Sequence, residues 1–177
     1  MSSTLQSGEK FPSGVVFQHI PLDAQSSPLA CSRPIPFDFD AKTKGKKVVI
    51  VSVPGAFTPT CTENHIPAFV ENFSKLTAKG ADYVIVLSAN DPFVLNAWGN
   101  LLGGGKVDHP EKLIWASDGN AEFASKIGFG LDLTSKGMGP RTGRFAIIVD
   151  DGKVVYSEIE PAGGVTVSGY DAVLAKL

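Results

Sequence analysis

The sequence predicts an α/β fold with a mixed central sheet flanked by helices. Short runs rich in Val, Ile and Leu alternate with segments of helical periodicity, the order expected of parallel strands joined by helical crossovers. Near the C-terminus, two apolar runs flank the turn Asp150-Asp151-Gly152-Lys153, which indicates an antiparallel hairpin. Because residues 1–177 contain no linker or repeat, we expect them to form a single domain.

The first half of the chain predicts two strands. Residues 15–20 follow a Pro-Ser-Gly turn and form the first, and residues 47–53 form a central strand whose continuous β-branched run is typical of burial on both faces. Residues 21–45 hold four prolines and are expected to be irregular. The central strand stops at Pro54-Gly55.

A helical pattern begins at Cys61 and is closed by Gly80. Apolar residues recur in it at three- and four-residue spacing, namely Ile66, Phe69, Val70, Phe73 and Leu76. Pro67 should kink this helix or lie in its early turns. A second buried strand is expected at residues 83–87.

The remaining elements are a helix capped by Asp91, a strand, a short helix, the hairpin and a final helix capped by Ser168. Their expected ranges are 92–102, 113–116, 120–127, 145–149 with 154–157, and 168–177. Crossovers first and a hairpin last fit a thioredoxin-type architecture better than a Rossmann sheet, which would end in further crossovers.

Composition excludes several classes of function. The chain is 43% apolar and 19% charged, as in a globular protein, and its net charge of −2 gives no reason to expect nucleic acid. We see no apolar stretch of membrane-spanning length. Two cysteines and three scattered histidines offer no ligand spacing, so we expect neither a metal nor another cofactor.

The segment from Pro54 to Cys61 carries the chemistry, because it joins a buried strand to a helix start. Unpaired N–H groups there favour a thiolate over a thiol. A free cysteine is only about 3% ionised at neutral pH, and full activation needs more than a helix dipole supplies, so a nearby cation is expected. Either Arg141 or Arg144, which flank the entry to strand 145–149, is suited to this role. An inert buried cysteine is the alternative.

Four segments in order and spacing resemble the peroxiredoxins. Pro54-x-x-x-Thr58-x-x-Cys61 is similar to the active-site signature of that family. The segments 57–61, 65–67 and 96–99 resemble the peroxiredoxin-5 (type II) subfamily, and the likeness runs from about Phe11 to Leu177. The resemblance implies a thioredoxin-like fold, a hydroperoxide substrate and a peroxidase activity.

By this resemblance Cys61 is the peroxidatic cysteine, Thr58 positions the peroxide and Pro54 shields the pocket. Arg144, directly before the aromatic residue of the late strand, matches the active-site arginine, and Arg141 is the lesser candidate. The thiolate attacks the peroxide and becomes a sulfenic acid, which a second thiol converts to a disulfide. Thioredoxin, or glutathione with glutaredoxin, then reduces it.

Cys31 departs from much of the subfamily, whose resolving cysteine lies later in the chain. Its early, proline-rich position resembles the fungal alkyl hydroperoxide reductase branch, where an early cysteine resolves the sulfenic acid across a homodimer. We expect the same of Cys31. The alternative is a bystander, with an external thiol resolving Cys61.

His65 lies one helical turn after Cys61, and we expect it to bond a backbone group rather than act as a general base. Two other functions would keep Cys61 reactive: a monothiol disulfide exchanger, and a non-enzymatic redox sensor or chaperone. Neither needs the combination of Pro54, Thr58, Cys61 and Arg144, so the peroxidase is favoured.

The polar N-terminus carries no secretory signal, so we expect a cytoplasmic protein. Ala175-Lys176-Leu177 is a variant of the Ser-Lys-Leu peroxisomal address. The alternative reading is that a helix simply ends in these three residues.

Overall fold

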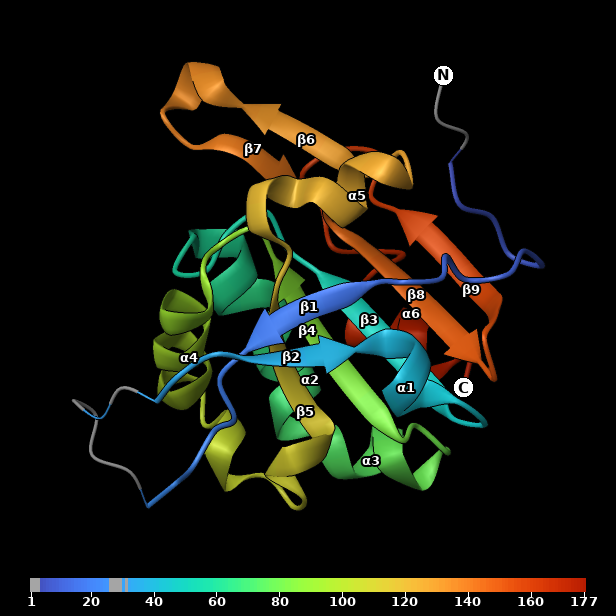
Figure 1. Cartoon of the computed structure of the whole chain (residues 1–177). Coiled ribbons are helices and arrows are strands. Elements are labelled where there is room, and N and C mark those ends of the chain that lie inside the picture. The colour runs from blue at the N-terminus through green and yellow to red at the C-terminus, as the bar shows by residue number, and fades with distance from the viewer. Residues whose placement is uncertain (1–3, 26–29, 31) are drawn as a thin grey trace.

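The computed structural model describes residues 4–25, 30 and 32–177. Seven strands form one sheet in the order β2-β1-β5-β4-β3-β8-β9 (Figure 1). They are β1 (Val16–His19), β2 (Ile35–Asp38), β3 (Lys47–Ser52), β4 (Tyr83–Ser88), β5 (Leu113–Ser117), β8 (Phe145–Asp150) and β9 (Lys153–Ile159). β3, β4 and β5 are parallel to one another, whereas β1, β8 and β9 run antiparallel to their neighbours. The predicted mixed sheet is confirmed.

Helices cover both faces of this sheet (Figure 1). The helices of one face are α2 (Ile66–Glu71), α3 (Phe73–Ala78), α4 (Pro92–Leu101) and α6 (Tyr170–Leu174), and those of the other are α1 (Phe39–Thr43) and α5 (Glu122–Lys126). Val49 and Val51 of β3 pack toward the first face, whereas Val48 and Ile50 pack toward the second. Burial on both sides explains why this strand is continuously apolar.

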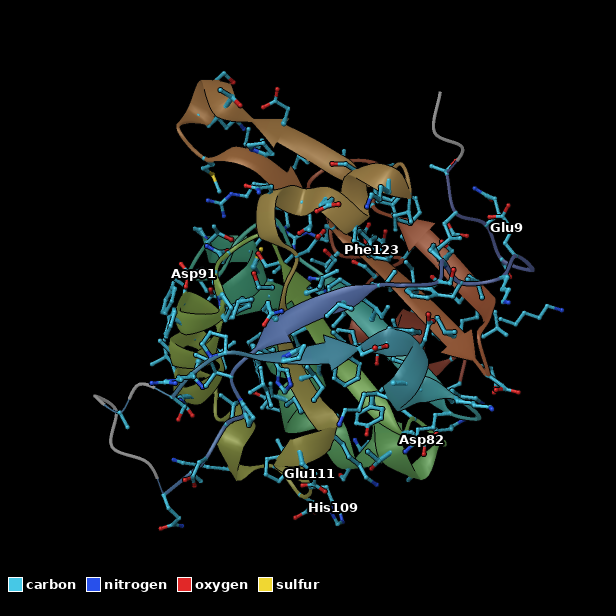
Figure 2. The ribbon with its side chains drawn as sticks, in the orientation of Figure 1. Glu9, Asp82, Asp91, His109, Glu111 and Phe123 are labelled. Carbon is cyan, nitrogen blue, oxygen red and sulfur yellow. The ribbon has the colours of Figure 1, made fainter. Side chains whose placement is uncertain are left out.

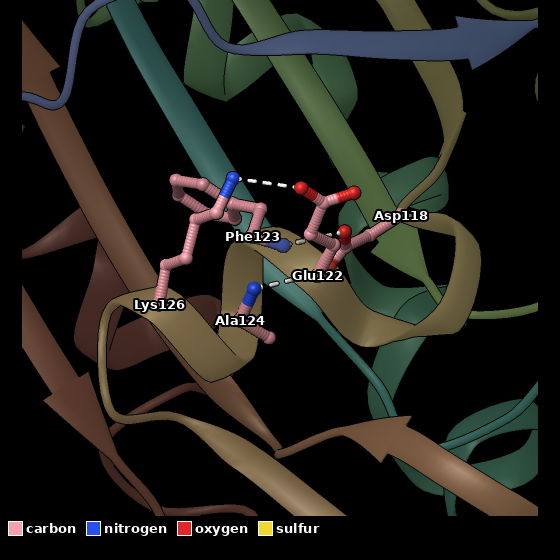
Figure 3. Close-up of polar contacts among 5 residues, drawn as sticks. All are labelled: Asp118, Glu122, Phe123, Ala124 and Lys126. Carbon is pink, nitrogen blue, oxygen red and sulfur yellow. Dashed lines mark hydrogen bonds and ion pairs between the residues drawn. The ribbon is translucent and has the colours of Figure 1, made fainter. Parts of the chain in front are cut away.

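Acidic side chains pair the N–H groups at the start of two helices, and the first of them, Asp91, is the cap that the sequence predicted. The carboxylate of Asp91 accepts hydrogen bonds from the N–H groups of Phe93 and Val94 at 2.9 and 3.0 Å, and it lies at the start of α4 (Figure 2). The carboxylate of Asp118 accepts from the N–H groups of Phe123 and Ala124, both at 2.9 Å, before α5 (Figure 3). Each acid satisfies donors that a helix start otherwise leaves unpaired.

The long helix expected after Cys61 is divided into three pieces. Thr60–His65 form a π-helical turn, and α2 and α3 follow it. Pro67 lies in the first turn of α2, as predicted, and has no N–H to donate backward. Gly80 ends the region with a φ of 101°.

The remaining chain differs from the sequence expectations in three places. Residues 21–45 are not wholly irregular, because β2 forms on the edge of the sheet, where Pro36 is tolerated, and Asp38 caps α1 by accepting from the Ala41 N–H at 3.0 Å. The hairpin of β6 (Gly130–Leu133) and β7 (Gly139–Thr142) was not expected. Ser168 does not cap α6 (Tyr170–Leu174), because the residue at the N-cap position of this helix is Gly169.

Short 3-10 turns connect several of these elements, at Gly104–Lys106, Pro110–Lys112, Gly119–Ala121 and Thr134–Lys136. Among the described helices, none has the length and apolar character needed to span a bilayer.

Candidate active site

Cys61 lies where the chain leaves β3 and enters the π-helical turn. Its side chain belongs to the core cluster beneath α2 and α4, and the residue is 1% exposed. The Ile66 N–H donates to the Cys61 carbonyl, which is the five-residue step of a π-helix rather than the four-residue step of an α-helix. The sequence pattern predicted the position of this turn but not its wider winding.

Strand pairing brings Arg144 to the sulfur. β3 and β8 are adjacent and antiparallel, with Ser52 opposite Phe145, so the residue before β8 lies beside the loop that follows β3. Arg144 Nη2 donates a hydrogen bond to Cys61 Sγ at 3.4 Å. The fixed positive charge of the guanidinium favours the anionic form of a sulfur at this distance.

The same guanidinium contacts His65. Arg144 Nη1 lies 3.0 Å from His65 Nδ1, and His65 Nε2 lies 2.8 Å from the Ser168 carbonyl oxygen. Burial lowers the pKa of His65 to about 4, so the imidazole is neutral at physiological pH. The expected backbone contact of His65 is present, and its contact with Arg144 is an addition that the sequence did not reveal.

Thr58 bonds within its own loop. Its hydroxyl donates to the Gly55 carbonyl oxygen at 2.8 Å, so the proton expected to serve the thiolate is directed to the backbone in this structure. The hydroxyl oxygen keeps lone pairs that can accept a hydrogen bond. Phe57 beside it has a φ of 60° and a ring that is 52% exposed, so the loop turns sharply before Cys61.

Arg141 forms its hydrogen bonds with the loop that precedes Cys61, whereas Arg144 is the arginine that bonds the Cys61 sulfur. Its Nη1 donates to the Pro54 carbonyl oxygen and to Asn90 Oδ1, each at 3.3 Å. Asn90 Oδ1 also accepts the Ala56 N–H at 2.9 Å. Pro54 itself is half-buried. Asn90 was missed by sequence reasoning, although its place just after β4, at the same end of the sheet as the loop after β3, was a usable signal.

The structure therefore brings together Pro54, Thr58, Cys61 and Arg144 around one loop and one strand end. Cys31 lies outside the described residues. Within those residues, no group of three or more His, Cys, Asp or Glu side chains is arranged to hold a metal ion.

Comparison with known proteins agrees with this arrangement. The Redoxin family model matches residues 6–174. A protein from Lipomyces kononenkoae named as a peroxisomal peroxiredoxin is 53% identical over 170 residues, which cover 96% of this chain and 99% of that protein. Peroxiredoxin AHP1 of Chaetomium thermophilum is 41% identical over 175 residues, covering 98% and 95%.

Solved structures agree as well. Reduced Prx3 of Vibrio vulnificus, crystallised in complex with hydrogen peroxide, has a TM-score of 0.82 at 30% identity and covers 97% of this chain and 95% of its own. Peroxiredoxin 5 of Alvinella pompejana has a TM-score of 0.73 at 26% identity, with 97% of each chain covered. The chain belongs to the Redoxin family and is a peroxiredoxin, a thiol-dependent peroxidase with a thioredoxin-like fold.

Proposed function

We propose that Cys61 is the nucleophile of this peroxidase and that hydrogen peroxide and alkyl hydroperoxides are its substrates. The observation that carries the proposal is the hydrogen bond from Arg144 Nη2 to Cys61 Sγ at 3.4 Å. A buried sulfur next to a fixed positive charge is poised to react as the thiolate, which is the nucleophilic form.

In the proposed reaction, the thiolate attacks the terminal oxygen of the hydroperoxide. The O–O bond breaks, an S–O bond forms, and the leaving oxygen takes a proton to become water or an alcohol. Arg144 stabilises the negative charge that develops on the oxygens. Thr58 accepts a hydrogen bond from the peroxide, because its own proton is directed to Gly55. Pro54 limits the entry of water.

The sulfenic acid of Cys61 then condenses with the thiol of Cys31, and water leaves as the disulfide forms. A thioredoxin, or glutathione with glutaredoxin, reduces the disulfide. We propose that this disulfide joins two chains of a homodimer. Ala30, which precedes Cys31, lines a groove of about 560 Å³ together with Phe57, Phe93 and Leu101, so this part of the chain shares a surface with the active-site loop.

A peroxisomal location is a further part of the proposal, if Leu177 is the last residue of the protein. The Lipomyces relative is named as peroxisomal. In the structure, Lys176 Nζ lies 5.8 Å from the centre of the Tyr156 ring and Leu177 packs against the core cluster. A receptor that reads this tripeptide would have to loosen the turn after α6.

The experiment is peroxide consumption with thioredoxin and its reductase, on the wild type, Cys61→Ser and Cys31→Ser. We expect Cys61→Ser to abolish turnover. Cys31→Ser should consume one equivalent of peroxide per chain and then stop, because the sulfenic acid forms but is not resolved. Continued turnover by Cys61→Ser would refute the assignment of the nucleophile. Full recycling by Cys31→Ser would leave resolution to an external thiol.

A further inference from the structure

The guanidinium of Arg144 is held at two of its nitrogens. Nη2 donates to Cys61 Sγ at 3.4 Å, and Nη1 lies 3.0 Å from His65 Nδ1. His65 is 1% exposed, and its other nitrogen lies 2.8 Å from the Ser168 carbonyl oxygen. A line of contacts therefore runs from the loop before α6, through the imidazole and the guanidinium, to the sulfur.

These contacts fix where the imidazole proton lies. A guanidinium only donates, so His65 Nδ1 must be the acceptor. The proton of the neutral ring is then on Nε2 and is donated to the Ser168 carbonyl. Burial lowers the pKa of His65 to about 4, which keeps the ring in this neutral state.

Ser168 is itself held in place by Glu160. One carboxylate oxygen of Glu160 accepts from the Ser168 N–H and from the Ser168 hydroxyl, both at 2.8 Å. The same carboxylate accepts from the Thr166 N–H and hydroxyl at 2.6 and 2.7 Å. The Glu160 carboxylate thus fixes the loop that contains Thr166 and Ser168. Arg144 makes no ion pair with a carboxylate in the part of the chain that the structure describes.

A neutral partner has a specific advantage at this position. A carboxylate in place of His65 would orient the guanidinium equally well, but it would cancel most of the charge that the sulfur requires. An imidazole without charge restricts the guanidinium and leaves its charge available to Cys61. We propose that His65 is a positioning residue that aims Arg144 at Cys61, anchored through Ser168 by Glu160. This inference rests on the proposed role of Cys61 as nucleophile.

Two substitutions separate the two contacts of the ring. In His65→Gln, the amide nitrogen replaces Nε2 and keeps the donor to Ser168, but no acceptor faces Arg144. In His65→Asn, the amide oxygen replaces Nδ1 and keeps the acceptor for Arg144. We expect His65→Gln to slow the reaction of reduced full-length protein with hydrogen peroxide about tenfold, and His65→Asn to stay within about threefold of the wild type.

The second readout is the rate of Cys61 alkylation by iodoacetamide as a function of pH, measured in a Cys31→Ser background. We expect the midpoint of this profile to move to higher pH in His65→Gln and to move less in His65→Asn. His19→Gln is the matched control, because His19 is also buried but lies on β1 against Phe37. It should leave both measurements unchanged.

Glu160→Ala tests the anchor without a change inside the core, and serves if His65→Gln does not fold. It should slow the peroxide reaction about threefold, with the same direction of shift in the alkylation profile. Equal rates for the Gln and Asn variants, or an unmoved alkylation profile in all three variants, would overturn the positioning role. Failure of the proposed function is a different result, namely peroxide turnover by Cys61→Ser.

Discussion

At the scale of single residues, the candidate site balances burial against one positive charge. Cys61 is 1% exposed, and removal from water disfavours an anion there. A guanidinium about 4 Å from an anion contributes roughly 4 kcal/mol at an effective dielectric constant of 20. The contact at 3.4 Å is of this kind, so Arg144 can offset much of the desolvation of a thiolate. The site needs Arg144 in a fixed orientation more than it needs further donors.

The buried His65 also makes the fold sensitive to acid. Its pKa is about 4 in the folded protein and 6.5 in a solvated chain, chiefly because burial disfavours the charged ring. As pH falls below 6.5, the unfolded chain takes up the proton first, so the free energy of unfolding decreases. The free energy of unfolding is therefore unaffected by the titration of His65 above pH 6.5. Between pH 6.5 and about pH 4 it falls by about 3 kcal/mol as a result of this one group.

We therefore expect wild type and His65→Gln to differ in the pH dependence of their stability. Urea unfolding between pH 7 and pH 4 should show a smaller loss for the variant, because glutamine has no proton to take up. Parallel stability curves for the two proteins would show that His65 does not titrate in this way.

At the scale of elements, the site is a consequence of strand order. The loop after β3 and the entry to β8 are neighbours because these two strands pair, and Asn90 joins them because β4 lies on the other side of β3. The sequence predicted β3, β4 and β8 from their buried apolar runs, so the approach of Arg144 to Cys61 was foreseeable. The contacts of Asn90 with Arg141 and of His65 with Arg144 were not predicted, because they depend on how side chains from separate elements pack together.

The elements that sequence reasoning missed lack a strong periodic signal. β2 has only four residues and includes Pro36, and the strands of the β6–β7 hairpin are short and largely exposed. The π-helical turn was missed because its apolar spacing is close to that of an α-helix over so few residues. Ser168 was misjudged as a cap because its side chain bonds Glu160 instead of the helix.

α4 approaches the sheet closely at Gly99, which gives a prediction about packing. A Cβ on Gly99 would lie 2.7 Å from Trp115 Cδ2 on β5, and Trp115 is almost fully buried. We expect Gly99→Ala to destabilise the protein by about 1–3 kcal/mol through overpacking. Thermal or urea unfolding measures this. Gly119→Ala is the control, since a Cβ there meets nothing within 4 Å. Equal stability of the two variants would contradict the close packing.

At the scale of the whole molecule, the seven-stranded sheet lies between the two core clusters of the described chain, and β6 and β7 form a separate two-stranded sheet. The two core clusters lie on opposite faces of the seven-stranded sheet and share its central strands. We therefore keep the prediction that residues 1–177 form a single domain. The loop before Cys61 and α4 expose apolar side chains on the same side of the molecule, Phe57 at 52%, Phe93 at 51% and Leu101 at 67%. An exposed apolar groove of this kind marks an interaction surface.

We expect a second copy of the chain to cover this groove, because the proposed disulfide between subunits requires Cys31 of one chain to reach Cys61 of the other. Cα atoms in a disulfide lie within about 7 Å, so the two chains must associate close to the active-site loop. Phe93→Asp places a charge in the lining of the groove and should convert the dimer to monomer, which sedimentation velocity of the reduced protein measures.

The same variant separates assembly from chemistry. Phe93→Asp should still react with one equivalent of peroxide, since the Phe93 side chain is half exposed whereas Cys61 belongs to the buried core cluster, but the disulfide-linked dimer on a non-reducing gel should decrease. Val155→Asp is the matched control, because Val155 is 43% exposed on the edge strand β9, away from the groove. A dimer that survives Phe93→Asp would show that this groove is not the interface. A wild type that is monomeric at micromolar concentration would place the disulfide within one chain or leave Cys61 to an external thiol.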